Sequence, residues 1–203
     1  MIFAAILVII AGGILYFNTS ENNRVEEESI TTITEIENLI DQNNALLDAM
    51  SEQNTSAEIT LRNVDINEAV GAKASTKVNG VTYIGIVYIP SLNNLAVPVI
   101  DTCTESNLKI SACRYAGTLE ENNIVIAGHN YKSLFGKLNK LSVGNILYFK
   151  DLEGNAHKYK CVEIITLNEN DVEKMQTGNW DLTLFTCTYR GNQRLTYRFE
   201  ITN

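Results

Sequence analysis

The hydrophobic period changes once along this chain, and the change limits the folds that the chain can adopt. Between residues 26 and 50, apolar side chains recur every three or four positions, which is the spacing of one helical stripe, and acidic side chains occupy the opposite face. From Lys77 onward the apolar period is two, which is typical of strands. We therefore expect a helical N-terminal part followed by a mostly β domain.

Seven stretches after Lys77 have the composition and alternation of strands, and they lie at 82–89, 95–100, 123–129, 145–151, 157–167, 181–189 and 194–202. Hairpin turns are expected at 152–155 and 190–193, where Gly and Asn occur together. Short helices are expected around residues 104–112, 132–141 and 169–177. Many short strands with few helices indicate a β-barrel or a β-sandwich.

The charge of the chain is unevenly distributed. Residues 18–70 hold 12 acidic and 2 basic side chains, whereas residues 71–203 hold 12 acidic and 14 basic ones, and the sum is the formal net charge of −8. The C-terminal domain therefore lacks the strong basic excess that a nucleic-acid-binding domain carries, and no nucleic-acid partner is expected. Four cysteines in 203 residues are also too few for a small fold that depends on disulfides.

The N-terminal apolar run predicts a membrane anchor. Residues 2–17 hold no charge, and Met1 with residues 18–20 extends the run toward the roughly 20 residues that a spanning helix needs. A cleaved signal peptide is the alternative, but no basic residue precedes the run, and Tyr16-Phe17 does not fit a small-residue cleavage site. We therefore interpret residues 1–18 as an uncleaved transmembrane signal anchor.

An acidic helical stalk and linker is expected at 19–70, ahead of a single domain at 71–203. The apolar stripe of the stalk has two interpretations. It could pack on the globular domain or on a second copy of the chain, or the helix could be a solvated spacer between the membrane and the domain. We favour the spacer.

The last predicted hairpin places a thiol close to guanidinium groups. If Gly191-Asn192 is the centre of the turn, Cys187 lies opposite Thr196, and Arg194 and Arg198 are its diagonal neighbours. A guanidinium beside a thiol favours the nucleophilic thiolate, and it can donate hydrogen bonds to an oxyanion. The alternative interpretation is a half-buried cysteine near solvated arginines.

Two histidines could act as a base for such a thiol. His129 ends the apolar stretch 123–129, and functional residues are often found where an element ends and a loop begins. His157 follows a turn and is expected to point to solvent. His129 is therefore the candidate base, because a cysteine nucleophile needs a histidine within reach.

Thr183-Leu184-Phe185-Thr186-Cys187 followed by Arg194 resembles the TLxTC…R signature of the sortases, and Ile126–Asn130 resembles the strand that carries the sortase histidine. Residues 84–99 and 135–138 agree with the family in order and spacing, so the resemblance covers about residues 82–202. It implies a mostly β fold, the eight-stranded sortase barrel. It also implies a cysteine transpeptidase held by a single-pass anchor, with its catalytic domain outside a Gram-positive cell membrane.

The resemblance also implies roles for individual residues. Cys187 would attack the carbonyl of a Thr–Gly-like bond in the sorting signal of a secreted surface protein. His129 would protonate the leaving amine and then deprotonate the incoming one, and Arg194 would hold the oxyanion or the substrate carbonyl. The acceptor would be an amine of a cell-wall precursor or of a pilin. No cofactor or metal is expected, since the domain has no dense acidic cluster of the kind that calcium would need.

Other readings remain open at this stage. The same scaffold could be a membrane-tethered thiol hydrolase, or a non-catalytic β domain for surface assembly in which Cys187 is structural. The short connection before Trp180 argues against a class B sortase, so we prefer a class D-like or housekeeping type. Cys161 alternates within a strand and is expected to be buried, and the spacing of Cys103 and Cys113 does not support a disulfide.

Overall fold

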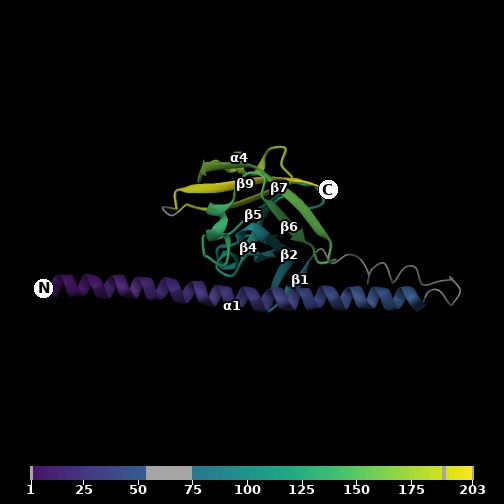
Figure 1. Cartoon of the computed structure of the whole chain (residues 1–203), viewed down its shortest axis with the longest axis horizontal. Helices are drawn as coiled ribbons and strands as arrows, with labels where there is room; N and C mark the ends of the chain where they lie inside the picture. The colour runs from purple at the N-terminus through teal and green to yellow at the C-terminus, as the bar shows by residue number, and fades with distance from the viewer. Residues whose placement is uncertain (1, 54–74, 189–190, 203) are drawn as a thin grey trace.

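The structure is a computed structural model that describes residues 2–53, 75–188 and 191–202, and the side chains of all of these except 2–15, 17 and 47–53. One helix, α1 (Ile2–Gln53), runs beside the β domain and extends past it on both sides (Figure 1). Within the described residues, no helix combines the length and the apolar character needed to cross a membrane. Most side chains of the expected anchor at 1–18 lie outside the described residues, so the anchor stays a prediction.

The strands of the described domain are β1 (Thr76–Val78), β2 (Val81–Ile89), β3 (Leu95–Ile100), β4 (Ala112–Ala116), β5 (Ile124–Ala127), β6 (Ile146–Lys150), β7 (Ala156–Asn168), β8 (Leu182–Cys187) and β9 (Gln193–Ile201). The short helices are η1 (Pro90–Leu92), α3 (Glu105–Leu108), η2 (Phe135–Lys140) and α4 (Val172–Gln176). All seven predicted strands and the three predicted helices are present. Two strands were not predicted: β1, which has only three residues, and β4, which has Arg114 at its centre and so lacks an apolar alternation.

Eight of the strands close into a barrel. Their order is β2-β3-β4-β5-β8-β9-β7-β6, and a β2–β6 pairing closes the ring, while β1 pairs with β2 outside it. Neighbours are antiparallel except for β3–β4 and β5–β8, which are parallel. The eight-stranded barrel expected from the resemblance is therefore confirmed.

The close contact of β2 with β6 depends on a glycine. Gly85 has a φ of 151°, and a Cβ at this position would lie 2.4 Å from the backbone oxygen of Lys150 and 2.5 Å from the Phe149 ring. A larger residue would push the two strands apart where the barrel closes. Inside the barrel, apolar side chains alternate inward, among them Leu182, Leu184, Tyr197 and Phe199, all of which are buried.

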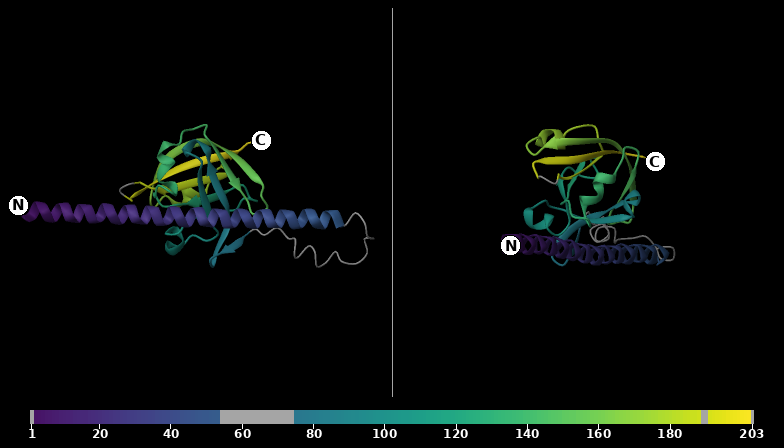
Figure 2. Two further views of the ribbon diagram at one scale, coloured as in Figure 1. Left: turned by 60° about the horizontal axis from the view of Figure 1, so that its bottom comes forward. Right: turned by 60° about the vertical axis from the view of Figure 1, so that its left-hand side comes forward.

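One face of α1 packs against the outside of the barrel, so our preference for a solvated spacer is wrong. Val25, Ile36 and Ile40 are at most 2% exposed, and the last two share a cluster with Tyr83, Ile86, Ile100 and other residues of the barrel. Figure 2 shows the helix lying along one side of the barrel in both views. The apolar stripe by itself does not show whether the helix faces water or protein, because the apolar surface on which it packs is formed by strands distant in the sequence.

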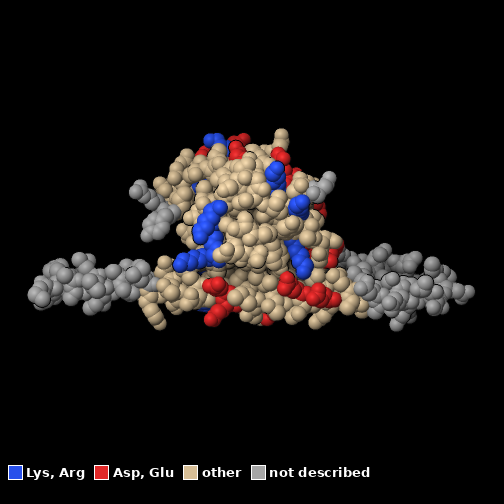
Figure 3. All heavy atoms as spheres, in the orientation of Figure 1, with Lys and Arg blue, Asp and Glu red and all other residues tan. Residues whose placement is uncertain are grey.

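Polar contacts add to this interface. The Tyr88 hydroxyl donates to Glu37 Oε1 at 2.7 Å, and Lys150 Nζ lies 3.9 Å from the same oxygen. The Lys132 backbone N–H donates to Asn22 Oδ1 at 3.1 Å. Figure 3 shows Asp and Glu along α1 next to Lys and Arg at the base of the barrel. The acidic character of the helix therefore complements the domain on which it packs.

Candidate active site

A pocket of about 220 Å³ brings together the three residues that the sequence singled out. Cys187 is the last residue of β8, His129 follows β5 by two positions, and Arg194 is the second residue of β9. All three line the pocket, and each is half-buried. The thiol, the imidazole and the guanidinium are therefore open to a ligand from the same side.

The strand order explains how these residues meet. β8 lies between β5, to which it is parallel, and β9, to which it is antiparallel. The carboxyl ends of β5 and β8 and the start of β9 consequently lie at one edge. Ala127 pairs with Phe185, and Gly128 N–H continues the pairing by donating to the Phe185 carbonyl at 3.1 Å. His129 lies two residues after Ala127, and Cys187 lies two residues after Phe185.

A glycine before His129 permits the close approach of the Phe135 ring to the end of β5. A Cβ on Gly128 would lie 2.6 Å from the Phe135 ring, which is fully buried. Phe135 N–H donates to the His129 carbonyl at 3.1 Å and fixes the backbone of the histidine against η2. Any larger residue at position 128 would therefore displace the buried ring of Phe135 or the backbone that carries His129.

The register of the last hairpin differs from our prediction. Cys187 pairs directly with Arg194, whereas Thr196 pairs with Phe185 and Arg198 with Thr183. Thr188 N–H donates to the Gln193 carbonyl, so the turn is centred one residue earlier than Gly191-Asn192. Moving the centre by one residue shifts the pairing by two, which brings Arg194 closer to the thiol than predicted and takes Arg198 away from it.

The charge state of His129 follows from its surroundings. Burial lowers the pKa of His129 below its ordinary 6.5, and the positive charge of Lys109 lowers it further. The imidazole is therefore mainly neutral at pH 7 and able to accept a proton. Its ring lies beside Tyr131, with 5.2 Å between the ring centroids.

The guanidinium of Arg194 is oriented by the turn. Its Nη1 donates to the Gly191 carbonyl at 2.8 Å and to the Gln193 carbonyl at 3.3 Å. Its other nitrogens make no hydrogen bond with any residue that the structure describes. Donors anchored on one side and free on the other suit the recognition of a carbonyl oxygen or an oxyanion.

The walls of the pocket come from residues that the sequence did not mark as functional. Tyr115 of β4 stacks edge-on against Phe185, with ring centroids 5.2 Å apart, and Val172 and Met175 of α4 form another wall. The Thr186 hydroxyl is buried there without a hydrogen-bond partner among the described residues. These residues share no motif, and only the fold brings them to the pocket.

The remaining cysteines lie partly beside the pocket. Cys103 lines it, and Cys113 is buried in a cluster against which Cys103 packs. A hydrogen bond to Cys103, together with burial, raises the pKa of Cys113. The expected burial of Cys161 is confirmed, and burial raises the pKa of this thiol to about 11. All four cysteines are free thiols.

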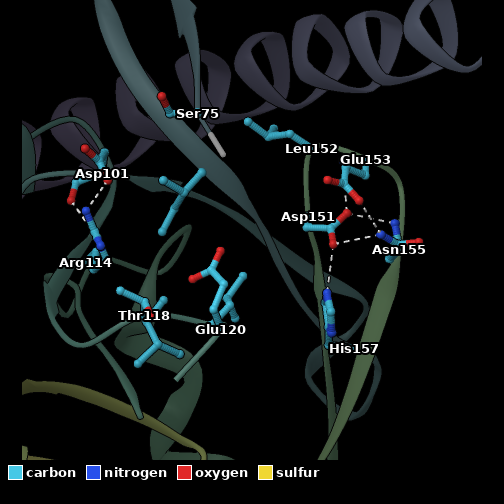
Figure 4. Close-up of a pocket in the computed structure, with 13 residues that line it drawn as sticks. Ser75, Asp101, Arg114, Thr118, Glu120, Asp151, Leu152, Glu153, Asn155 and His157 are labelled. Carbon is cyan, nitrogen blue, oxygen red and sulfur yellow. Dashed lines mark hydrogen bonds and ion pairs between the residues drawn. The ribbon is translucent and has the colours of Figure 1, made fainter. Parts of the chain in front are cut away.

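The second histidine belongs to a different pocket. His157 Nε2 lies 2.8 Å from Asp151 Oδ2 (Figure 4). Both residues line a cavity of about 550 Å³ that includes Ile124, the first residue of β5, whereas His129 follows the last residue of that strand. His157 was expected to point to solvent, and its side chain is 34% exposed, but the carboxylate of its own hairpin engages it. Among the described residues, no group of three or more His, Cys, Asp or Glu side chains could hold a metal ion.

Comparisons with known proteins identify the family to which this chain belongs. A family model of the sortase domain matches residues 87–201. Among solved structures, the chain is similar to a Clostridium perfringens sortase D5 transpeptidase, with 23% identity and a TM-score of 0.53 over 60% of this chain and 79% of that one. It is similar to Streptococcus pneumoniae sortase C, with 22% identity and a TM-score of 0.58 over 85% and 97% of the two chains. It is also similar to Listeria monocytogenes sortase A, with 25% identity and a TM-score of 0.55 over 60% of this chain and 88% of that one.

No curated protein sequence matches the chain. Since the family match covers more than half of the chain, the protein belongs to the sortase family of cysteine transpeptidases.

Proposed function

We propose that this sortase cleaves the sorting signal of secreted surface proteins at a Thr–Gly-like bond and transfers the cleaved protein to an amine of the cell wall or of a pilin. The observation that carries the proposal is the convergence of Cys187, His129 and Arg194 on one pocket. A structural cysteine would not need a neutral imidazole and a partly free guanidinium beside it, so this convergence counts against a non-catalytic β domain.

The first half of the reaction makes a thioester. Cys187 Sγ attacks the Thr carbonyl, and its proton passes to the neutral imidazole of His129. The carbonyl oxygen becomes an oxyanion that the free donors of Arg194 stabilise. When the C–N bond breaks, His129 returns the proton to the leaving Gly amine, and the acyl group stays on sulfur.

The second half resolves the thioester. An acceptor amine attacks the thioester carbonyl and gives a proton to His129, and Arg194 again stabilises the oxyanion. The C–S bond then breaks, the amide product leaves, and the Cys187 thiol regains its proton from His129. Both halves use the same three groups in opposite order, so one pocket serves both steps.

The expected location is a further part of the proposal. Residues 1–18 anchor the chain in the cell membrane, and the catalytic domain lies outside the cell. The apolar run at 2–17 supports the anchor, and the packing of α1 on the barrel from Val25 onward supports a domain held close to the membrane surface. The class D-like or housekeeping type stays our preference among the sortase classes.

The experiment is mass spectrometry of the full chain incubated with a library of sorting-signal peptides, with and without triglycine or a lysine peptide as acceptor. We expect an acyl adduct on Cys187 without acceptor and an amide-linked product with acceptor. Cys161→Ala is the matched control and should still form the adduct. Products that contain only the hydrolysed peptide at high acceptor concentration would identify a thiol hydrolase instead, and the absence of any adduct would overturn the assignment of Cys187.

A further inference from the structure

Arg198 is buried on the outer face of β9, away from the catalytic pocket. It pairs with Thr183 of β8 on one side and with Glu163 of β7 on the other. Its side chain is only 6% exposed. A buried guanidinium is costly unless its donors are used, so its partners identify its role.

The partners of Arg198 join the barrel to the β7–β8 connection, which runs from residue 169 to residue 181. Nη1 donates to Glu163 Oε2 on the barrel at 2.7 Å, and Nη2 donates to the Lys174 carbonyl in α4 at 2.6 Å. The guanidinium carbon lies 3.5 Å from the centroid of the Trp180 ring, at the far end of the connection. One side chain therefore fixes both the middle and the end of this segment.

The other side of the same segment faces the catalytic pocket. Val172 and Met175 of α4 line the pocket with Cys187. Met175 is buried against the barrel, and its sulfur accepts a hydrogen bond from the Thr196 hydroxyl at 3.7 Å. The Lys174 carbonyl held by Arg198 immediately precedes Met175, so the position of this pocket wall depends on that contact.

α4 cannot hold this position by itself. It has five residues, and a helix of this length has no intrinsic stability in water. Its order must come from tertiary contacts. A lysine could replace only part of the Arg198 contribution, because an ammonium has no planar fork to reach Glu163 and Lys174 together and no flat face to stack on Trp180.

We propose that Arg198 is a positioning residue that pins the β7–β8 connection against the barrel and so holds α4 as the wall of the peptide-binding pocket. The proposal rests on the proposed function for its effect on peptide binding, but the pinning itself is a property of the fold. Because Arg198 does not touch the pocket, its loss should weaken substrate binding and leave the chemical steps at Cys187 unchanged.

Trp180 makes the test direct, because it is the single tryptophan of the chain. In Arg198→Met we expect Trp180 emission to shift to longer wavelength and to be quenched more strongly by acrylamide. Amide hydrogen exchange should become faster in residues 169–181 and stay unchanged in β8. Lys174→Ala is the matched control on the same segment, since Arg198 contacts only the backbone of Lys174, and it should behave like the wild type.

Kinetics with a sorting peptide give the second readout. We expect Arg198→Met to raise KM on the order of tenfold with kcat within about threefold of the wild type, the pattern of lost uniform binding. Arg198→Lys should lie between the wild type and Arg198→Met in Trp180 emission and in KM. If Arg198→Met does not fold, Arg198→Lys alone tests the proposal.

Unchanged Trp180 emission and unchanged amide exchange in both variants would overturn the proposal. A fall in kcat without any change at Trp180 would overturn it too. If the wild type turns over no sorting peptide, the proposed function fails, while fluorescence and exchange still decide whether Arg198 pins the connection.

Discussion

The two pockets at opposite ends of the barrel each contain one of the two histidines, and they differ in how their polar groups are used. In the larger pocket, His157 is paired with Asp151 and Arg114 with Asp101. In the smaller pocket, the His129 ring has no hydrogen bond to a described residue, and Arg194 has donors left over.

This difference shows that pocket size is a poor guide to chemistry in this fold. In the larger pocket, these ion pairs hold the β6–β7 hairpin and the end of β3. In the smaller pocket, the described residues give the Cys187 thiol and the His129 imidazole no hydrogen bond, and they engage only Nη1 of Arg194. Half-buried groups with unused hydrogen-bonding capacity are available to a substrate.

Cys187→Ala should have the largest effect. Loss of a nucleophile commonly costs several orders of magnitude in kcat, and turnover of sorting peptides should disappear. The melting temperature should stay near that of the wild type, because the side chain is half-buried at the pocket. Cys161→Ala should show the opposite pattern, with activity retained at low temperature and a lower melting temperature, since its side chain is fully buried in the core. Residual turnover at the wild-type rate in Cys187→Ala would exclude this pocket as the active site.

His129→Ala should be nearly as damaging, with kcat lower by about 10²–10⁴, the usual contribution of general acid–base catalysis. His157→Ala is the matched change in the other pocket, and its kcat should be within about twofold of the wild type, since His157 serves the hairpin and not the thiol. Steady-state kinetics on both variants tests the comparison. An inactive His157→Ala with an active His129→Ala would move the site to the opposite end of the barrel.

Arg194→Ala should lower kcat by about 10²–10³, which is typical of the loss of one oxyanion donor and corresponds to roughly 2.7–4 kcal/mol. KM should change less, because the interaction is strongest in the transition state. Arg194→Lys should restore only part of kcat, since an ammonium lacks the planar fork. Kinetics with a single sorting peptide checks this. A variant with normal kcat and raised KM would assign Arg194 to substrate binding only.

Asp151→Asn should affect stability and not activity. Burial alone would raise the pKa of Asp151, but hydrogen bonds from His157 and Asn155 outweigh it, and the pKa lies below the ordinary 3.8. The carboxylate therefore stabilises the fold above pH 3.8, and this stability is lost as the pH falls through the lower, folded-state pKa. A partly exposed pair contributes at most about 1 kcal/mol, so the variant should melt about 2–4 °C lower at pH 7. The difference should shrink toward pH 3 in thermal melts. A constant difference across this range would remove the titration of Asp151 as its cause.

Lys109→Met should have the smallest effect. Because the charge of Lys109 lowers the pKa of His129, its removal should raise that pKa and move the acidic limb of the kcat/KM profile to higher pH. NMR titration measures the two histidines separately, and His157 is the internal control. Lys109→Arg keeps the charge and should titrate like the wild type. If the neutral substitution leaves the His129 titration in place, burial alone sets its pKa.

Much of the fold could be predicted because its signals are local. The apolar period of two predicted seven strands, and the resemblance of the segments around His129, Cys187 and Arg194 to the sortase signature predicted the candidate site. Strand β4 was not predicted, because Arg114, which pairs with Asp101, occupies a position where an apolar residue would continue the alternation. The residues of the pocket walls were not predicted, because Tyr115, Val172 and Met175 come from three separate positions that share no spacing.

Local sequence patterns predicted seven of the strands and a helix with an apolar stripe in the N-terminal part. These features depend on neighbouring residues, whose alternation is set by the backbone geometry of a helix or a strand. The grouping of Cys187, His129 and Arg194 came instead from the resemblance to the sortase signature, and it stays a prediction. The tertiary fold alone sets the pairing of Cys187 with Arg194, the burial of Arg198 beneath α4 and the packing of α1 on the barrel. A shift of the turn centre by a single residue moves the register by two, and an apolar stripe packs on whichever surface the rest of the chain presents, so these outcomes depend on contacts between residues far apart in the sequence.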